Sequence, residues 1–397
     1  MKCFSIAVFS VTFSLNIFCF NVGANERNIN SVDDLFTHSL TSHSVEKNKR
    51  AIARALALNY VHIAKGISYY ITEYNLSMPV NEIDGLPIAT VANIDDYSIN
   101  INQLKGINSQ ANDKPSEVVQ IRLADESMLV QLQAGEVPLF VFSSNDEGDG
   151  NIEAFGADGR VEYLDAYRLP TQPVFIVELN KEKTIKAGLE AMNAIFDQVE
   201  GQITSSERRL LSNQPTSMVA EPLSMTVIKN IEVQKIKESW ISGPAEVYAI
   251  ITGVNASGDE LTPKIDVVEL PYLDKAQKEY TPNQIIVQWD NYRWQAVDIL
   301  LMESDDNINY KALATALLNV ATQVLQFIPE TTTQTAAIIT RLTNAVIQAM
   351  PDSWTTNEDD FIDVFYTIFE GESYSEYQGA SQNAKMTLAP LVIRPRG

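Results

Sequence analysis

The sequence predicts an α+β protein in which an N-terminal helix packs against a mostly antiparallel sheet and is followed by a β-sandwich with an inserted helical hairpin. Three observations support this fold class. Apolar residues recur every three or four positions after residue 44, short strand-like runs separated by turns begin near residue 76, and two nearly uncharged helical segments interrupt the later strands. A chain of 397 residues is long enough for two domains of this kind.

The first 24 residues have the pattern of a secretory signal peptide. Lys2 is followed by an apolar run from Cys3 to Phe20, and small residues precede a cleavage site predicted after Ala24. The run is short for the bilayer core, so we expect no permanent transmembrane segment after cleavage. The predicted location is therefore secreted or periplasmic. Both cysteines, Cys3 and Cys19, lie in this segment, so we expect a mature protein without disulfides.

Acidic residues far outnumber basic ones in this chain. There are 51 Asp and Glu against 29 Lys and Arg, which gives a formal net charge of -22. Nucleic-acid binding relies on many Lys and Arg contacts to phosphates, so nucleic acid is excluded as an expected partner. The partners that remain are an extracellular protein, a glycan or a lipid surface, and the sequence does not select among them.

Residues 25–180 are expected to form the α+β domain. The apolar spacing over 44–74 predicts one long amphipathic helix with Ser44 as its N-cap. Strands are expected at LPIATVAN, EVVQIRL, VPLFVFSS, NIEAFG, RVEYLDAY and PVFIVEL, and Asp158 and Gly159 form a hairpin turn of the Asp-Gly type. The segment between EVVQIRL and VPLFVFSS is expected to contain one short helix.

Residues 181–222 are expected to join the two domains through a helix that begins near Thr184 and a polar linker, SSERRLLSNQPTS. Residues 223–397 then form the predicted β-sandwich domain. Its strands are expected at SMTVIKNIEVQKIKE, SGPAEVYAIITGV, PKIDVVEL, NQIIVQW, AVDILLM, DFIDVFYTIF and AKMTLAPLVI. Many short strands at fairly regular spacing are typical of a sandwich.

The helical hairpin at 311–350 has two interpretations. Its first helix has no charged residue between Ala312 and Pro329, and its second has only Arg341, as a membrane-inserting hairpin would. However, polar Asn and Gln residues interrupt the first helix, and Pro329 and Pro351 end the two segments. These features favour a hairpin that packs on the sheet.

An acidic stretch, ESDDNINY from Glu303 to Tyr310, suggests a metal site. Its D-x-N-x-N spacing resembles the start of an EF-hand, but Tyr310 and Ala316 stand where that loop needs Gly and Glu. A second acidic stretch, NEDDFID, begins a later strand, and calcium could bind if the two loops meet. The alternative is that 305–307 cap the next helix and 357–360 form a solvated turn. The candidate ligands are Asp305, Asp306, Asn307, Asp359 and Asp360.

Catalytic motifs are scarce in the sequence. There is no G-x-S-x-G elbow, phosphate loop or dinucleotide fingerprint, and the three histidines do not form H-E-x-x-H. An extracellular hydrolase with Asp or Glu acid-base chemistry remains the alternative function, although no catalytic pair can be named. The aromatic residues Trp289, Tyr292 and Trp294 could stack on a sugar, but strand geometry favours a place in the core.

Four sequence blocks carry a family resemblance. SGPAEVYAI, PYLDKAQKEYTPNQI, WDNYRWQAVDILLMESDDNINYKAL and NEDDFIDVFYTI, in this order, resemble an uncharacterised family of secreted bacterial proteins, a domain of unknown function. The order of AEVYAIITGV, NQIIVQW and VDILLMESDD also loosely resembles calcium-dependent lipid-binding β-sandwiches, in which paired aspartates in loops at one end hold the cation. The family resemblance carries no established activity, and the resemblance to these sandwiches implies calcium binding. We therefore expect a binding or surface-associated module that uses calcium, with the hydrolase as the alternative.

Overall fold

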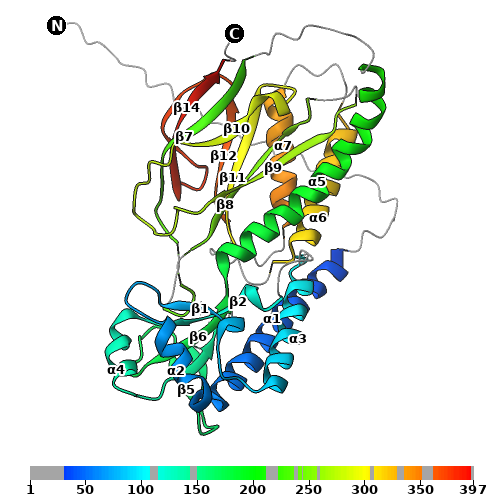
Figure 1. Ribbon diagram of the computed structural model, residues 1–397. Coiled ribbons are helices and arrows are strands. Elements are labelled where there is room, and N and C mark those ends of the chain that lie inside the picture. The colour runs from blue at the N-terminus through cyan, green and yellow to red at the C-terminus, as the bar shows by residue number, and fades with distance from the viewer. Residues whose placement is uncertain are drawn as a thin grey trace, which may run out of the picture.

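The computed structural model shows two lobes (Figure 1). It describes residues 31–107, 115–143, 150–211, 222–236, 240–243, 245–256, 260–304, 308–328, 335–350 and 361–394. The predicted signal peptide, with both cysteines, and residues 212–217 of the predicted linker lie outside these ranges. The linker prediction is wrong for residues 205–211, which belong to the helix Lys181–Leu211. The proposed domain boundaries stay predictions.

The N-terminal lobe packs helices against a mixed sheet of six strands. Its strand order is β1-β2-β6-β3-β4-β5, and only β3 and β6 pair in parallel, so the sheet is mostly antiparallel, as predicted. The helices are α1 (Ser31–Leu58), α2 (Tyr60–Tyr70), α3 (Ile88–Leu104) and α4 (Leu129–Gln133), with short 3-10 turns at Val80–Glu82, Pro115–Val118 and Glu126–Met128. The strands are β1 (Ser77–Pro79), β2 (Val119–Leu123), β3 (Leu139–Phe142), β4 (Asn151–Phe155), β5 (Val161–Asp165) and β6 (Val174–Leu179).

Two local predictions for this lobe are wrong. The expected single helix over 44–74 is divided at Asn59, whose side-chain amide donates to the Ala55 carbonyl at 2.8 Å, and α1 begins at Ser31, so Ser44 is not an N-cap. LPIATVAN is not a strand, because Ile88 begins α3 directly after Pro87. Pro is tolerated at a helix start, where its missing N–H would have no helical partner. The apolar spacing that supports α3 falls further along the chain, at Ile94 and Ile101.

The C-terminal lobe is a sandwich of two antiparallel four-stranded sheets. One sheet has the order β10-β7-β14-β13 and the other β12-β11-β8-β9, which confirms the predicted architecture. The strands are β7 (Leu223–Val233), β8 (Val247–Val254), β9 (Pro263–Leu270), β10 (Gln284–Gln288), β11 (Ala296–Glu303), β12 (Phe361–Phe369), β13 (Tyr374–Gln378) and β14 (Ala384–Ile393), with a 3-10 turn at Trp289–Asn291. Buried side chains from both sheets, such as Ile231, Ile251 and Phe365, fill the space between them.

The helical hairpin lies on the outer face of the β8–β11 sheet, opposite the sandwich core (Figure 1). It consists of α6 (Tyr310–Gln326) and α7 (Thr335–Ala349), and α5 (Lys181–Leu211) packs beside α6. Leu317 of α6, Leu342 of α7 and Leu300 of β11 are fully buried in one shared cluster, which forms a second apolar core. The hairpin therefore packs on the sheet, as the sequence favoured. Among the described residues, no helix is both long enough and apolar enough to span a membrane.

Candidate functional site

The five predicted calcium ligands, Asp305, Asp306, Asn307, Asp359 and Asp360, all lie outside the described residues. The strand ends beside them are described. Met302, one residue before the end of β11, pairs with Phe361, the first residue of β12. Paired residues of neighbouring antiparallel strands have Cα atoms roughly 5 Å apart. The two acidic stretches therefore adjoin the sheet at neighbouring positions, which sequence reasoning could not establish.

The helix after the first acidic stretch is capped by Asn309. The Asn309 Oδ1 atom accepts a hydrogen bond from the Ala312 N–H at 3.0 Å, and its amide donates to the Leu104 carbonyl at 2.7 Å. The alternative that residues 305–307 cap this helix is therefore wrong, because the cap lies two residues later. Asn309 has both side-chain groups engaged, so it is a structural residue rather than a candidate ligand.

Tyr310 fixes the same stretch to the rest of the molecule. Its N–H donates to the Lys105 carbonyl at 2.9 Å, and its hydroxyl lies 2.8 Å from the Ser304 hydroxyl. The Lys105 ammonium is buried, 5.3 Å from the centre of the Tyr310 ring, and Gly188 of α5 leaves room for that ring. These contacts hold Ser304 and Tyr310 in place. The first acidic stretch therefore leaves the sheet at the junction of α3, α5 and α6.

Asp363, in the second acidic stretch, has a structural role. Its carboxylate is fully buried and accepts hydrogen bonds from the backbone N–H groups of its neighbour Val364 and of three residues at the β13–β14 turn and the start of β14. These are Ser381 at 2.9 Å, Asn383 at 2.9 Å and Ala384 at 2.8 Å, and Val364 donates at 2.8 Å. A carboxylate that accepts four such bonds has little capacity left for a cation. Asp363 therefore holds a turn, rather than a metal.

Asp298, in the middle of the apolar strand β11, was missed by sequence reasoning. It is fully buried, and its Oδ1 atom accepts a hydrogen bond from the Thr367 N–H at 2.6 Å. Its Oδ2 atom has no well-aligned hydrogen bond within the described part of the chain. Burial raises the pKa of this carboxyl to about 6, while the Thr367 N–H and the nearby Thr343 hydroxyl lower it in part. The signal available in sequence was one acid within AVDILLM.

The surroundings of Asp298 are polar and strained. The hydroxyls of Thr252 on β8 and Thr343 on α7 lie 2.6 Å apart and are both buried. Thr367 has a φ of 60°, which is rare for a β-branched residue, and lies where the register of β11 and β12 shifts. Such features are enriched at functional sites. However, Asp298 is fully buried, so its carboxyl is not open to solvent among the described residues.

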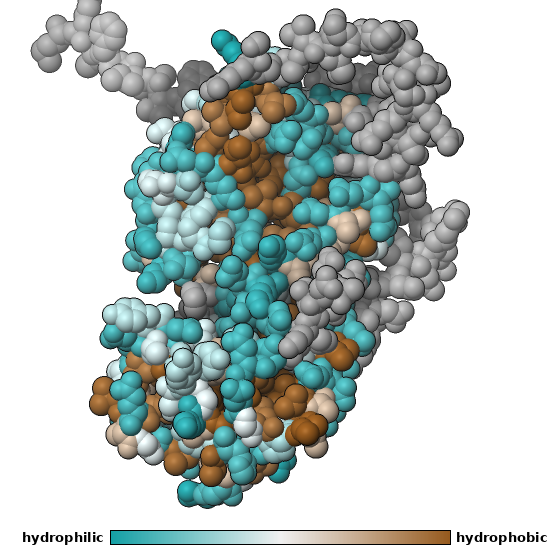
Figure 2. Space-filling model, in the orientation of Figure 1, coloured by the Kyte–Doolittle hydropathy of each residue, from teal (hydrophilic) through white to brown (hydrophobic). Residues whose placement is uncertain are grey.

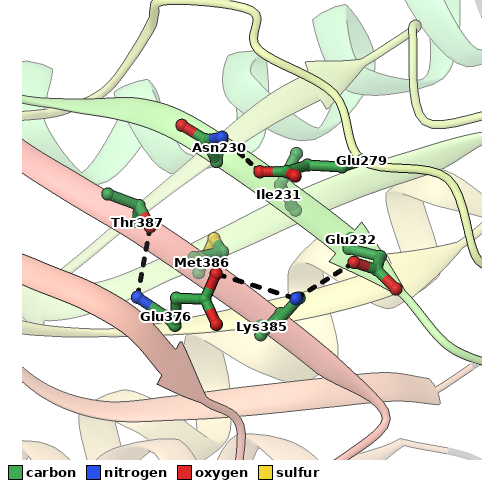
Figure 3. Close-up of a pocket in the computed structure, with 8 residues that line it drawn as sticks. All are labelled: Asn230, Ile231, Glu232, Glu279, Glu376, Lys385, Met386 and Thr387. Carbon is green, nitrogen blue, oxygen red and sulfur yellow. Dashed lines mark hydrogen bonds and ion pairs between the residues drawn. The ribbon is translucent and has the colours of Figure 1, made fainter.

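A small hollow does lie on the solvent-facing side of β7 and β14 (Figure 3). The Lys385 ammonium reaches Glu232 at 3.1 Å and Glu376 at 3.8 Å, and the Asn230 amide donates to Glu279. The hollow has a volume of about 10 Å³, enough for one water molecule. Its lining consists of Asn230, Ile231, Glu232, Glu279, Glu376, Lys385, Met386 and Thr387. It is a charged patch of sheet surface rather than a substrate pocket.

The described residues also bear on other metal clusters and on the predicted aromatic platform. No group of three or more His, Cys, Asp or Glu side chains there is arranged to hold a metal ion. Of the three aromatic residues considered as a sugar platform, Trp289 and Tyr292 are buried in the sandwich core and Trp294 is partly buried against the second apolar core. The Trp289 indole also donates to the Thr226 hydroxyl at 2.9 Å. The core interpretation is therefore confirmed.

Comparison with known proteins places this architecture in a family. A family model described as "Protein of unknown function (DUF3103)" matches residues 49–396. The chain belongs to the DUF3103 family. The match covers both lobes and agrees with the resemblance to an uncharacterised family, and it indicates no activity. No curated protein and no solved structure matches this DUF3103 chain.

Proposed function

We propose that this DUF3103 protein is a secreted binding or surface-associated module that holds calcium at the end of the sandwich where β11 and β12 pair. The observation that supports the calcium site is the pairing of Met302 with Phe361. Because these two residues are paired, the two acidic stretches are attached to neighbouring strand ends. A cation bound between the two stretches would therefore not require a large rearrangement of the sheet.

The donor chemistry suits calcium. Asp and Asn oxygens are hard ligands, and calcium takes six to eight of them at about 2.3–2.6 Å in flexible geometry. Asn309 and Asp363 are already engaged with backbone groups, which leaves the ligand set as first stated. That set is Asp305, Asp306, Asn307, Asp359 and Asp360. In the sequence the first three lie between Ser304 and Tyr310, whose hydroxyls are 2.8 Å apart.

The alternative, an extracellular hydrolase, has less support. It requires two carboxylates that converge on a space large enough for a substrate and a water molecule. Among the described acids, Asp363 is saturated by backbone N–H groups and Asp298 faces packed side chains. The carboxylates around Lys385 surround a hollow that holds only one water. A binding module therefore fits the described residues better.

Calcium titration of the mature chain tests this proposal. The protein, stripped of divalent ions with a chelator, is heated with increasing CaCl₂ or MgCl₂. We expect calcium to raise the unfolding temperature, because a ligand at 100 times its dissociation constant stabilises the folded state by roughly 2.7 kcal/mol. The double variant Asp305→Asn with Asp359→Asn should lose the shift, whereas Asp290→Asn, at an exposed acid elsewhere in the lobe, should keep it. No shift at millimolar calcium would remove the proposal.

A further inference from the structure

The N-terminal lobe carries a locally basic surface in a strongly acidic protein. Between residues 44 and 70 the chain has five Lys and Arg residues and one acid, Glu46, against a net charge of -22 for the whole sequence. Lys47, Arg50, Arg54 and Leu58 are spaced three or four residues apart and exposed, so they line one face of α1. Charge of opposite sign to the rest of the molecule is therefore concentrated on one helix face.

The edge strand β5 extends this face. β5 is the last strand of the six-stranded sheet and pairs only with β4 in the described structure. Tyr163 lies close enough to Arg50 to affect the pKa of its guanidinium, and Gly159, just before β5, lies against Leu58. The C-terminal end of α1 thus meets the turn before β5, and Arg50 lies near Tyr163 of that strand. We call this surface the α1–β5 face, and its members are Lys47, Arg50, Arg54, Leu58, Val161 and Tyr163.

Exposed apolar groups are mixed with the cations on this face. Tyr163 is 70% exposed, Leu58 52% and Val161 45%, and Val61, at the start of α2, is 84% exposed. Figure 2 shows hydrophobic groups among hydrophilic ones over the lower lobe, where α1, α2 and β5 lie. Arg50 is paired with Glu153 at 2.5 Å, whereas Lys47 and Arg54 make no ion pair with another described residue. Two cations are therefore available to an external anion.

From this arrangement we propose that the α1–β5 face docks on an anionic lipid surface, with Lys47 and Arg54 on lipid phosphates and Leu58, Val161 and Tyr163 at the headgroup boundary. Cations interleaved with aliphatic and Tyr side chains are the composition of interfacial membrane-binding surfaces. The charge distribution also favours an anionic membrane as the partner. Such a membrane would repel the rest of this acidic chain, and the repulsion would orient the α1–β5 face toward the lipid. The inference rests on the proposed role as a surface-associated module and names the surface.

This docking does not involve the proposed calcium site, which is in the other lobe. It therefore differs from calcium-bridged binding in a measurable way. Binding through the α1–β5 face should occur in the presence of a chelator and weaken as salt screens the cations. Each cation near an anionic membrane contributes enough to change affinity roughly fivefold, so loss of two should weaken binding about 25-fold.

The test is flotation of the mature chain with vesicles of phosphatidylcholine, alone or mixed with phosphatidylglycerol, in EDTA at low salt. We expect flotation with the mixed vesicles only. The variant Lys47→Gln with Arg54→Gln should bind about 25-fold more weakly. The matched variant Lys229→Gln with Lys278→Gln, which removes the same charge from exposed positions of the other lobe, should bind like wild type. Circular dichroism confirms that each variant is folded.

Several outcomes would overturn the inference. Absence of flotation in EDTA, or equal binding by the two double variants, would do so. Binding only with calcium would assign docking to the other lobe. Full competition by inorganic phosphate would indicate a site for the free anion, and salt-sensitive binding to polyglutamate without flotation would indicate an acidic protein partner. If calcium still raises the unfolding temperature in any of these cases, the calcium site stands and only the α1–β5 inference fails.

Discussion

Replacement of Asp298 by Asn should stabilise the protein at neutral pH. The carboxyl is fully buried, and burial raises its pKa from the ordinary 3.8 to about 6. An acid whose pKa is raised by folding stabilises the folded state below its ordinary pKa, and this contribution is lost as the pH rises through the folded value. At pH 7.5 the wild-type protein therefore holds a buried charge, whereas the Asp298→Asn variant would hold a neutral amide at the same position.

The size of the effect follows from the shift. A rise of the pKa from 3.8 to about 6 lowers the free energy of unfolding by about 3 kcal/mol between a pH at which Asp298 is fully protonated and one at which it is fully ionised. Between pH 5 and pH 7.5 the wild-type protein should lose about 1.4 kcal/mol of this contribution. Asn keeps an oxygen that can accept the hydrogen bond from the Thr367 N–H. The advantage of the variant should therefore be about 1.4 kcal/mol larger at pH 7.5 than at pH 5.

Urea unfolding of both proteins at pH 5 and pH 7.5, followed by tryptophan fluorescence, measures this difference. Asp290→Asn removes an exposed carboxylate from the same lobe and serves as the control for the loss of one charge. The reasoning would be refuted if Asp298→Asn lowered the free energy of unfolding equally at both pH values. That result would mean that the buried carboxylate is ionised and stabilising throughout, held by its polar neighbours.

Three further substitutions test the structural residues around the candidate site. Asn309→Ala should lower the free energy of unfolding by about 2 kcal/mol, because it removes the N-cap of α6 and the bond to the Leu104 carbonyl, whereas Asn309→Asp should restore the cap alone in urea unfolding. Asp363→Asn should cost about 3 kcal/mol, since an amide group would face backbone N–H donors of the β13–β14 turn, and hydrogen exchange should show faster opening of that turn. Gly188→Ala should cost about 2 kcal/mol through contact with the Tyr310 ring, and Gly188→Ala with Tyr310→Leu should recover part of the loss in thermal unfolding.

The architecture was largely predictable because the sandwich is encoded in local patterns. Strands β7 to β12 and β14 appear in the sequence as alternating or continuously apolar runs, and the almost uncharged helices α6 and α7 show helical apolar spacing. Strand β13, YSEYQ, was not predicted, because its residues are mostly polar and exposed. The errors occurred where a few residues decide the outcome. Pro87 precedes the first residue of α3, so the apolar run LPIATVAN begins a helix rather than a strand. The Asn59 side chain interrupts an apolar pattern that otherwise favours one long helix.

The candidate site was less predictable because the roles of acidic side chains depend on tertiary contacts. Asp363 belongs to an acidic stretch in sequence, yet its carboxylate accepts hydrogen bonds from backbone N–H groups of a turn about twenty residues later. Asn309 belongs to another such stretch, yet it caps α6 and bonds to α3. Asp298 stands alone in an apolar run, and only packing against Thr343 and Thr367 shows that it is a perturbed acid. Sequence spacing carries none of this information.

The most direct test of the proposed function is a crystal structure of the mature chain grown with calcium, with anomalous scattering used to locate the ion. The account predicts one calcium ion at the end of the β11–β12 pair, coordinated by oxygens from both 305–307 and 359–360. Ordered acidic stretches that lie apart, with no ion between them at millimolar calcium, would contradict it.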